Sequence, residues 1–116
     1  MKLSLLKREI ERSPEFWTVP LMDFVDNFRR RGTVEDLDGP LTIRDDNTTA
    51  LVASVIEHLC DEKNIDPPPW VHEVPSCKDP WFVSGIENLK AIALVESPIH
   101  FRKRKIFVLE NFLDRV

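Results

Sequence analysis

Apolar side chains recur at helical spacing along much of the 116-residue chain. The i, i+3, i+4, i+7 spacing of a helix with one face in a core is followed by Leu21, Phe24, Val25 and Phe28. A wider apolar stripe runs through residues 46–64, where Asp46-Asn47 opens the segment. The pattern therefore predicts helices over residues 3–12, between Thr18 and Gly32, and over residues 46–64.

The stretch 84–96, SGIENLKAIALVE, has apolar residues around nearly the whole circumference of a helix. A helix that is apolar on all sides is a buried helix. Ser84 and Glu87 have the spacing of a capping box at its start, and Ser97-Pro98 ends it. We therefore expect residues 84–96 to form a central buried helix, with the amphipathic helices packed around it.

Residues 66–82 contain five prolines and two tryptophans, which excludes a regular helix or a central strand there. We expect an irregular segment that Trp70 and Trp81 anchor to the core. A short helix is predicted from Ile99 to about Arg104, and a last turn from Glu110 to Arg115.

The predicted fold class is all-α: a single domain over residues 1–116, with five or six helices around the central helix at 84–96. An α+β alternative forms a small sheet from residues 41–43 and 106–108, because both segments read as short strands.

Composition restricts the functional classes. Hydrophobic residues make up 42% of the chain and charged residues 31%, as in globular proteins, and a net charge of −4 gives no general attraction to nucleic acid. No apolar run approaches the ~20 residues of a membrane span, and the N-terminal stretch lacks the pattern of a signal peptide. We therefore expect a cytoplasmic protein with no membrane association, in which Cys60 and Cys77 are free thiols.

Four potential metal ligands, His58, Cys60, His72 and Cys77, do not have the spacing of a metal site. His58 and Cys60 lie two residues apart, about 200° around a helix, so they do not readily bind one ion. Cys77 and His72 share a loop but carry no specific signal of a nucleophile and its base. The chain has three glycines, too scattered for a phosphate-binding loop. We therefore predict no metal, no cofactor and no catalytic residue, and a metal-free enzyme is the third interpretation.

Basic residues gather at Arg102–Lys105 and at Arg29–Arg31. Arginines bind the carboxylates of a protein partner through paired hydrogen bonds, whereas a basic cluster beside aromatic residues is also typical of phosphate binding. The candidate partner-binding residues are Arg102, Lys103, Arg104 and Arg115. Nucleic-acid binding by Arg102–Lys105 is the alternative, and the sequence leaves the oligomeric state open.

Four motifs of the second half, PPPWV, DPWF, SPIHFRKRKIFV and FLDRV, carry a family resemblance. The DFVDNF segment of the first half fits the same pattern more loosely, so the resemblance covers about two thirds of the chain. They resemble the pattern of a group of small uncharacterised bacterial proteins found beside predicted nucleotidyltransferases, in arrangements like toxin–antitoxin pairs. The pattern is carried by Trp70, Trp81, Phe82, Phe101, Arg102, Arg104, Ile106, Phe107, Leu113 and Arg115. The resemblance implies a partner-binding or neutralising role. We therefore expect a small cytoplasmic bacterial protein-interaction module, antitoxin-like towards the product of a neighbouring gene.

Overall fold

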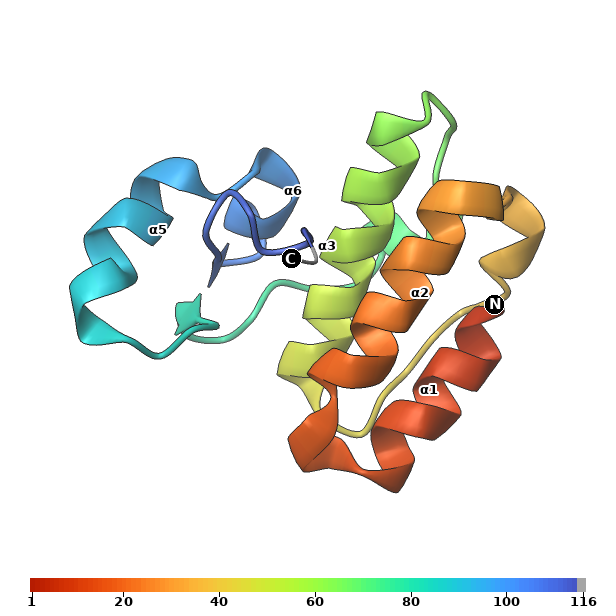
Figure 1. Cartoon of the computed structure of the whole chain (residues 1–116), viewed down its shortest axis with the longest axis horizontal. Coiled ribbons are helices and arrows are strands. Elements are labelled where there is room, and N and C mark those ends of the chain that lie inside the picture. The colour runs from red at the N-terminus through yellow and green to blue at the C-terminus, as the bar shows by residue number, and fades with distance from the viewer. Residues whose placement is uncertain (115–116) are drawn as a thin grey trace.

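Three helices from the first half of the chain lie side by side in the computed structural model, which describes residues 1–114 (Figure 1). They are α1 (Leu3–Arg12), α2 (Thr18–Arg31) and α3 (Asp46–Glu62). Helix α1 packs on α2, and α2 packs on α3. Short 3₁₀ turns, η1 (Pro14–Phe16) and η2 (Val34–Asp36), follow α1 and α2. The first-half helices therefore lie where their apolar spacing predicts them.

Helix α3 is the centre of the molecule. Every residue from Ala50 to Glu57 is buried, because α3 packs on α2 on one side and on elements of the second half on the other. Its N-terminus is capped by Asp45, whose carboxylate accepts hydrogen bonds from the Asn47 N–H at 3.0 Å and the Thr48 hydroxyl at 3.1 Å. The central buried helix is thus α3.

The prediction of a central buried helix at residues 84–96 is wrong. This stretch forms a 3₁₀ turn, η3 (Glu87–Leu89), and a seven-residue helix, α5 (Lys90–Glu96), at the end of the molecule away from α1 and α2 (Figure 1). Ala93 is the buried residue of α5. The predicted capping box is not formed, since the Ser84 hydroxyl accepts from the N–H of Ile86, before the helix begins. The apolar residues of this stretch therefore lie mostly on the surface, and their distribution around the helix did not indicate burial.

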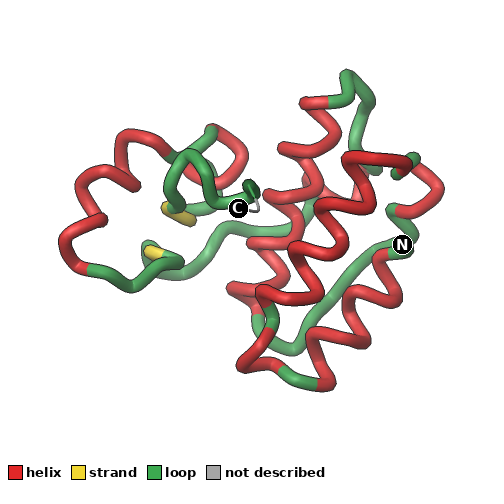
Figure 2. Tube along the Cα trace, viewed as in Figure 1, coloured by secondary structure: helices red, strands yellow, loops and turns green. Residues whose placement is uncertain are grey.

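The rest of the second half consists of short elements joined by loops (Figure 2). They are the helices α4 (Pro69–His72) and α6 (Ile99–Arg102) and the strands β1 (Trp81–Phe82) and β2 (Ile106–Phe107). The strands pair in parallel, with Trp81 beside Ile106 and Phe82 beside Phe107. Residues 110–113 form turns, and residue 115, the end of the predicted last turn, lies outside the described residues.

The all-α fold class is confirmed, because helices dominate and the two strands are two residues long. The pairing proposed in the α+β alternative is wrong. Residues 106–107 pair with residues 81–82, and residues 41–43 are an extended segment outside the sheet.

The tryptophans of the proline-rich segment anchor it to the core, as predicted. Trp70 and Trp81 are partly buried against the core cluster. Gly39 lies directly on the indole of Trp70: a Cβ at residue 39 would come within 2.3 Å of the ring, so a larger side chain has no room there. Within residues 1–114, no helix combines the length and the apolar character needed to cross a membrane.

Candidate protein-binding surface

Arg104 is not available to a partner, and its prediction as a partner-binding residue is wrong. The residue is 3% exposed and forms an ion pair with Glu57 of α3. Its guanidinium also donates to the carbonyl oxygens of Val71, at 2.8 Å, and Val74, at 3.4 Å. Arg104 therefore connects the turn after α6 to α3, to α4 and to the segment that follows α4.

Glu57 is the centre of a buried ionic cluster. It is 4% exposed and faces Arg104, the ammonium group of Lys103 at 2.5 Å, and Nδ1 of His100 at 3.3 Å. Burial alone would raise the pKa of the Glu57 carboxyl. The hydrogen bond from Lys103 and the positive charges of Arg104 and Lys103 outweigh burial, and the pKa lies below its ordinary value of 4.5. The cluster stabilises the packing of α6 on α3.

Arg102 and Lys103 are also engaged within the chain. One guanidinium nitrogen of Arg102 donates to the carbonyl oxygens of Val95, at 3.3 Å, and Ser97, at 2.8 Å, at the C-terminal end of α5. This contact suits the negative end of the α5 dipole. Partner binding by Arg102 and Lys103 stays a prediction, and Arg115 lies outside the described residues.

The second basic group and the neighbouring aromatic rings give little support to nucleic-acid binding. Arg29 donates to Glu62 and to the carbonyl oxygen of Leu113. Phe101 is 1% exposed, and Phe107 stacks on Phe82 with 5.0 Å between ring centroids. These rings are occupied by other parts of the chain rather than presented to bases.

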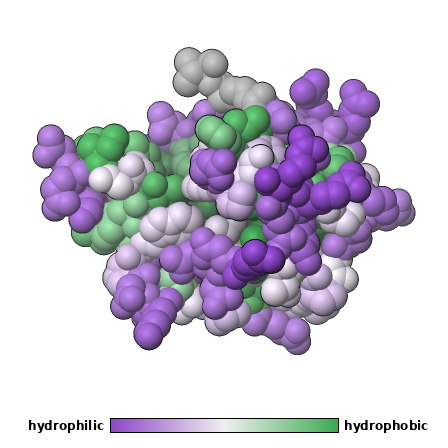
Figure 3. Space-filling view, turned by 90° about the horizontal axis from the view of Figure 1, so that it is seen from below, coloured by the Kyte–Doolittle hydropathy of each residue, from purple (hydrophilic) through white to green (hydrophobic). Residues whose placement is uncertain are grey.

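Large aliphatic side chains are exposed instead on α5 and its flanks. We call this set the α5 surface: it comprises Ile86, Ile92, Leu94, Val95 and Ile99, which are 54%, 45%, 48%, 78% and 64% exposed. Apolar side chains gather in Figure 3 at the same end of the molecule as α5. Ala91, which is also exposed, completes the solvent side of this helix.

The α5 helix thus has the reverse of the usual amphipathic pattern. A surface helix normally buries its apolar stripe and exposes charged residues. In α5, the small side chain of Ala93 is buried, whereas Ile92, Leu94 and Val95 face solvent. Clustered exposed aliphatic residues of this kind are typical of sites that bind another molecule.

A shallow cavity of about 500 Å³ adjoins the α5 surface, between α5 and the C-terminal segment. Its apolar wall includes Leu89, Ile92 and Leu109, and its rim includes three carboxylates. They belong to Glu96, Glu110 and Asp114. We call these three residues the acidic rim. Oδ1 of Asp114 lies 3.6 Å from Nη1 of Arg29, and Oε1 of Glu96 accepts a hydrogen bond from the backbone N–H of Glu110 at 3.0 Å.

Ser97 holds the C-terminal end of α5 in place. Its buried hydroxyl donates to the carbonyl oxygen of Val108 at 3.0 Å and accepts from the Val108 N–H at 2.7 Å. The sequence pattern suggests a helix cap at Ser97, but the hydroxyl joins the segment after β2 instead. Together with the Arg102 contact, this pair of bonds fixes the orientation of the α5 surface.

The residues considered as metal ligands or nucleophiles lie apart or in apolar surroundings. Within the described part of the chain, no group of three or more His, Cys, Asp or Glu side chains is arranged to hold a metal ion. Cys60 and Cys77 are buried free thiols. Burial raises the pKa of Cys60 to about 11, and burial with the nearby Asp45 charge raises that of Cys77. Both thiols are therefore poor nucleophiles near neutral pH.

Most residues that carry the family resemblance stabilise the fold. Phe101, Ile106 and Leu113 are buried, Arg104 belongs to the buried ionic cluster, and Trp70 packs on the core. The exposed aliphatic residues of α5 lie outside the quoted motifs. Comparison with protein-family models, curated proteins and solved structures found no match. Function therefore has to be inferred from the geometry of the chain itself.

Proposed function

We propose that this chain is a cytoplasmic protein-interaction module that binds an amphipathic helix of a partner protein on the α5 surface. The supporting observation is that the solvent side of α5 is aliphatic, whereas Arg102 beside it is bonded to the C-terminal end of α5. The proposed partner helix has aliphatic residues on one face and Lys or Arg beside them.

The apolar contribution to such an interface would be substantial. Full burial of a Val, Leu or Ile side chain contributes about 1.5–3 kcal/mol, so burying the exposed half of each α5 side chain contributes roughly 1 kcal/mol. Five such side chains form a central apolar cluster, the part of an interface in which binding energy concentrates. Ser97 and Arg102 hold the helix in place, which lowers the entropy lost on binding.

The acidic rim is the reason for expecting a basic partner. Glu96, Glu110 and Asp114 surround the cavity beside Ile92, and the whole chain has a net charge of −4. Lys and Arg residues flanking the apolar anchors of a helix would meet these carboxylates. A second copy of this chain would instead bring one acidic rim towards another, which disfavours a symmetric dimer through α5.

An antitoxin-like role is the finer part of the proposal. The resemblance to bacterial proteins encoded beside predicted nucleotidyltransferases supports it, and the product of the adjacent gene is the first partner to test. Neutralisation would require the α5 surface to bind that protein and cover a functional part of it.

The decisive experiment measures binding of the purified adjacent gene product, and of its amphipathic helices as peptides, to the wild type and to Val95→Glu. Val95 is 78% exposed, so the variant should fold normally while an apolar contact becomes an unpaired buried carboxylate on binding. We expect affinity to fall at least tenfold. The matched control is Val34→Glu on η2, where an exposed valine lies outside the α5 surface.

Charge gives a second measurement. Glu110→Lys should weaken binding of the same helix, and the loss should shrink at high salt because a rim charge is screened. Equal binding by Val95→Glu and the wild type would overturn the proposal. Sedimentation that shows a dimer dissociating in Val95→Glu would assign the surface to a second copy instead.

A further inference from the structure

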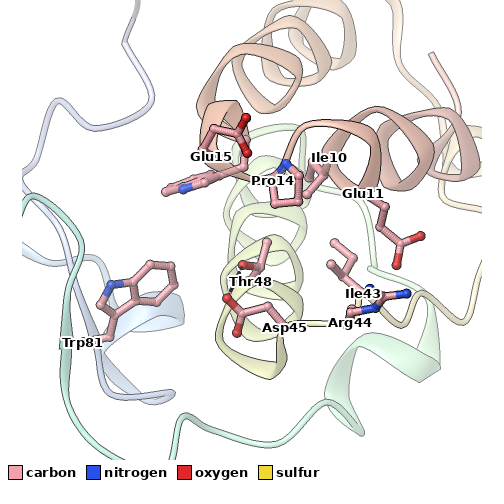
Figure 4. Close-up of a pocket in the computed structure, with 10 residues that line it drawn as sticks. Ile10, Glu11, Pro14, Glu15, Ile43, Arg44, Asp45, Thr48 and Trp81 are labelled. Atoms are coloured by element: carbon pink, nitrogen blue, oxygen red, sulfur yellow. Dashed lines mark hydrogen bonds between the residues drawn. The ribbon is translucent and has the colours of Figure 1, made fainter.

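A second cavity, of about 500 Å³, lies on another part of the molecule, between η1, the segment before α3 and strand β1 (Figure 4). We call it the Trp17–Trp81 pocket. Among the described residues, its lining combines both indoles with three acidic residues and a single arginine. The charged residues are Glu11, Glu15, Arg44 and Asp45. A volume of this size accommodates a small organic ligand or a long side chain.

The two indoles form an aromatic wall. Their ring centroids are 6.1 Å apart and the rings are tilted by 52°, so their faces are not closed against each other as in a parallel stack. Both tryptophans are partly buried and pack against the core, which fixes their position. The face of an indole carries negative electrostatic potential and attracts a cation within about 6 Å of the ring centroid.

The charges of the lining favour the same class of ligand. Three carboxylates less one guanidinium leave two negative charges in the lining. Figure 4 shows Arg44 on the side of Glu11, opposite Trp81, so the cation of the lining lies away from this indole. A ligand cation in the pocket would meet the two indoles and a lining with more carboxylates than cations.

An anion is the less suitable occupant, although α3 begins beside the pocket. The positive end of a helix attracts anions through its free N–H groups. Here the Asp45 carboxylate already accepts from the Asn47 N–H and from the hydroxyl of Thr48. The helix end is therefore satisfied by the chain itself, and the remaining lining charge repels an anion.

We propose that the Trp17–Trp81 pocket binds an organic cation, an alkylammonium or alkylguanidinium group of the size of a Lys or Arg side chain. The cation is either a free small molecule or a side chain of a bound polypeptide, since both present the same group. The site is separate from the α5 surface and does not depend on the function proposed for it.

The three indole N–H groups provide an internal control for the test. Proton–nitrogen correlation spectra of the full chain would follow Trp17, Trp70 and Trp81 during titration with N-butylguanidinium and with the blocked peptide acetyl-Ala-Ala-Arg-Ala-Ala-amide. We expect saturable shifts for Trp17 and Trp81 and none for Trp70, which packs on Gly39 outside the pocket. Stronger binding of the peptide would assign the site to a side chain, and stronger binding of N-butylguanidinium to a free molecule.

Charge is tested with a neutral analogue and three variants. The same peptide with citrulline in place of arginine keeps the shape and loses the charge, so it should produce no saturable shift. Glu15→Gln should weaken binding of the arginine peptide about two- to fivefold, as expected for an exposed charge pair. Arg44→Gln should strengthen it, because the variant removes the cation of the lining. Glu35→Gln on η2 is the control and should bind as the wild type does.

Three results would overturn the proposal. The first is that the citrulline peptide shifts the Trp17 and Trp81 signals as much as the arginine peptide does. The second is that the shifts do not saturate or that the Trp70 signal moves equally. The third is that Arg44→Gln binds the arginine peptide as weakly as the wild type or more weakly. The substituted residues Glu15, Arg44 and Glu35 are exposed, so all three variants should remain folded. A normal far-ultraviolet circular dichroism spectrum and an unchanged thermal midpoint would check this.

Discussion

Helices α3 and α5 have similar apolar sequences and opposite environments. Both have hydrophobic residues around most of the helix circumference, yet every residue from 50 to 57 in α3 is buried, and Val95 in α5 is 78% exposed. The 17 residues of α3 pack against α2 and the second half together, whereas the seven residues of α5 lie at one end of the molecule. An apolar helix is stabilised when it is removed from water, but its sequence does not say whether the same chain or another molecule covers it.

The two halves also differ in how they are held together. Long amphipathic helices pack through apolar side chains in the first half. The second half has short helices and two-residue strands, and it is attached to α3 partly through the ionic cluster at Glu57. This difference predicts where substitutions should matter most.

Arg104→Met should have the largest effect on stability. It removes the buried one of the two cations that pair with the Glu57 carboxylate, and breaking a buried ion pair by removing one member costs about 3–5 kcal/mol. The double variant Glu57→Leu/Arg104→Met should lose much less, because it leaves neither charge of the pair unpaired in the interior. Urea denaturation of both variants would measure the difference. A double variant as unstable as Arg104→Met would show that the loss comes from packing rather than from charge.

A matched pair of leucine substitutions tests the contrast between the two helices directly. Leu59→Ala in α3 removes a residue that is 1% exposed and should cost about 2–5 kcal/mol. Leu94→Ala in α5 removes one that is 48% exposed and should cost about 0.5 kcal/mol or less. The measurement is the free energy of unfolding in urea. Equal losses would mean that α5 is buried in solution, through self-association or through a different packing.

Acid should weaken the connection between the halves. The pKa of Glu57 is lower in the folded chain than its ordinary value of 4.5, so the cluster contributes its full stability above that pH. The contribution is lost as the pH falls from about 4.5 through the folded pKa. Urea midpoints measured from pH 6 to pH 3 should therefore fall more steeply for the wild type than for Glu57→Leu/Arg104→Met. Parallel curves would remove Glu57 from the acid response.

Sequence patterns were sufficient for the helices of the first half. Residues 3–12 and the segment between Thr18 and Gly32 form helices as predicted, and the predicted helix at 46–64 ends at Glu62. Periodicity and helix-end residues are local signals, and each of these helices is long enough to show them. The segment at 66–82 was predictable only in part. Proline acts on its own backbone and its neighbours, and most of the segment is loop. The prediction of a wholly irregular segment is wrong, because the four-residue helix α4 and the strand β1 form within it.

The environment of the candidate sites depends on contacts between distant residues and was not predictable in the same way. Arg104 looks exposed in a basic run, but Glu57 of α3 holds it in the interior. One signal was present: Glu57 lies beside the apolar stripe of its helix, and a buried carboxylate requires a cationic partner. The Trp17–Trp81 pocket had no such signal, because its residues come from three separate segments of the chain.

The smallest expected effect concerns the order in which the two halves open. Cys60 on α3 and Cys77 in the loop before β1 are both buried, at 0% and 4% exposure, and their thiol pKa values are raised. Neither should react readily with iodoacetamide in the folded chain at neutral pH.

In low urea, Cys77 should react before Cys60. Its segment is held by short elements and by a backbone bond to Arg104, and weakly packed regions open at lower free energy than a central helix. Mass spectrometry of the labelled protein, with Cys60→Ala and Cys77→Ala to assign the sites, would measure both rates. Equal rates with the same dependence on urea would show that the two halves unfold as one cooperative unit. The contacts of the ionic cluster would then open at the same free energy as the apolar contacts between α2 and α3.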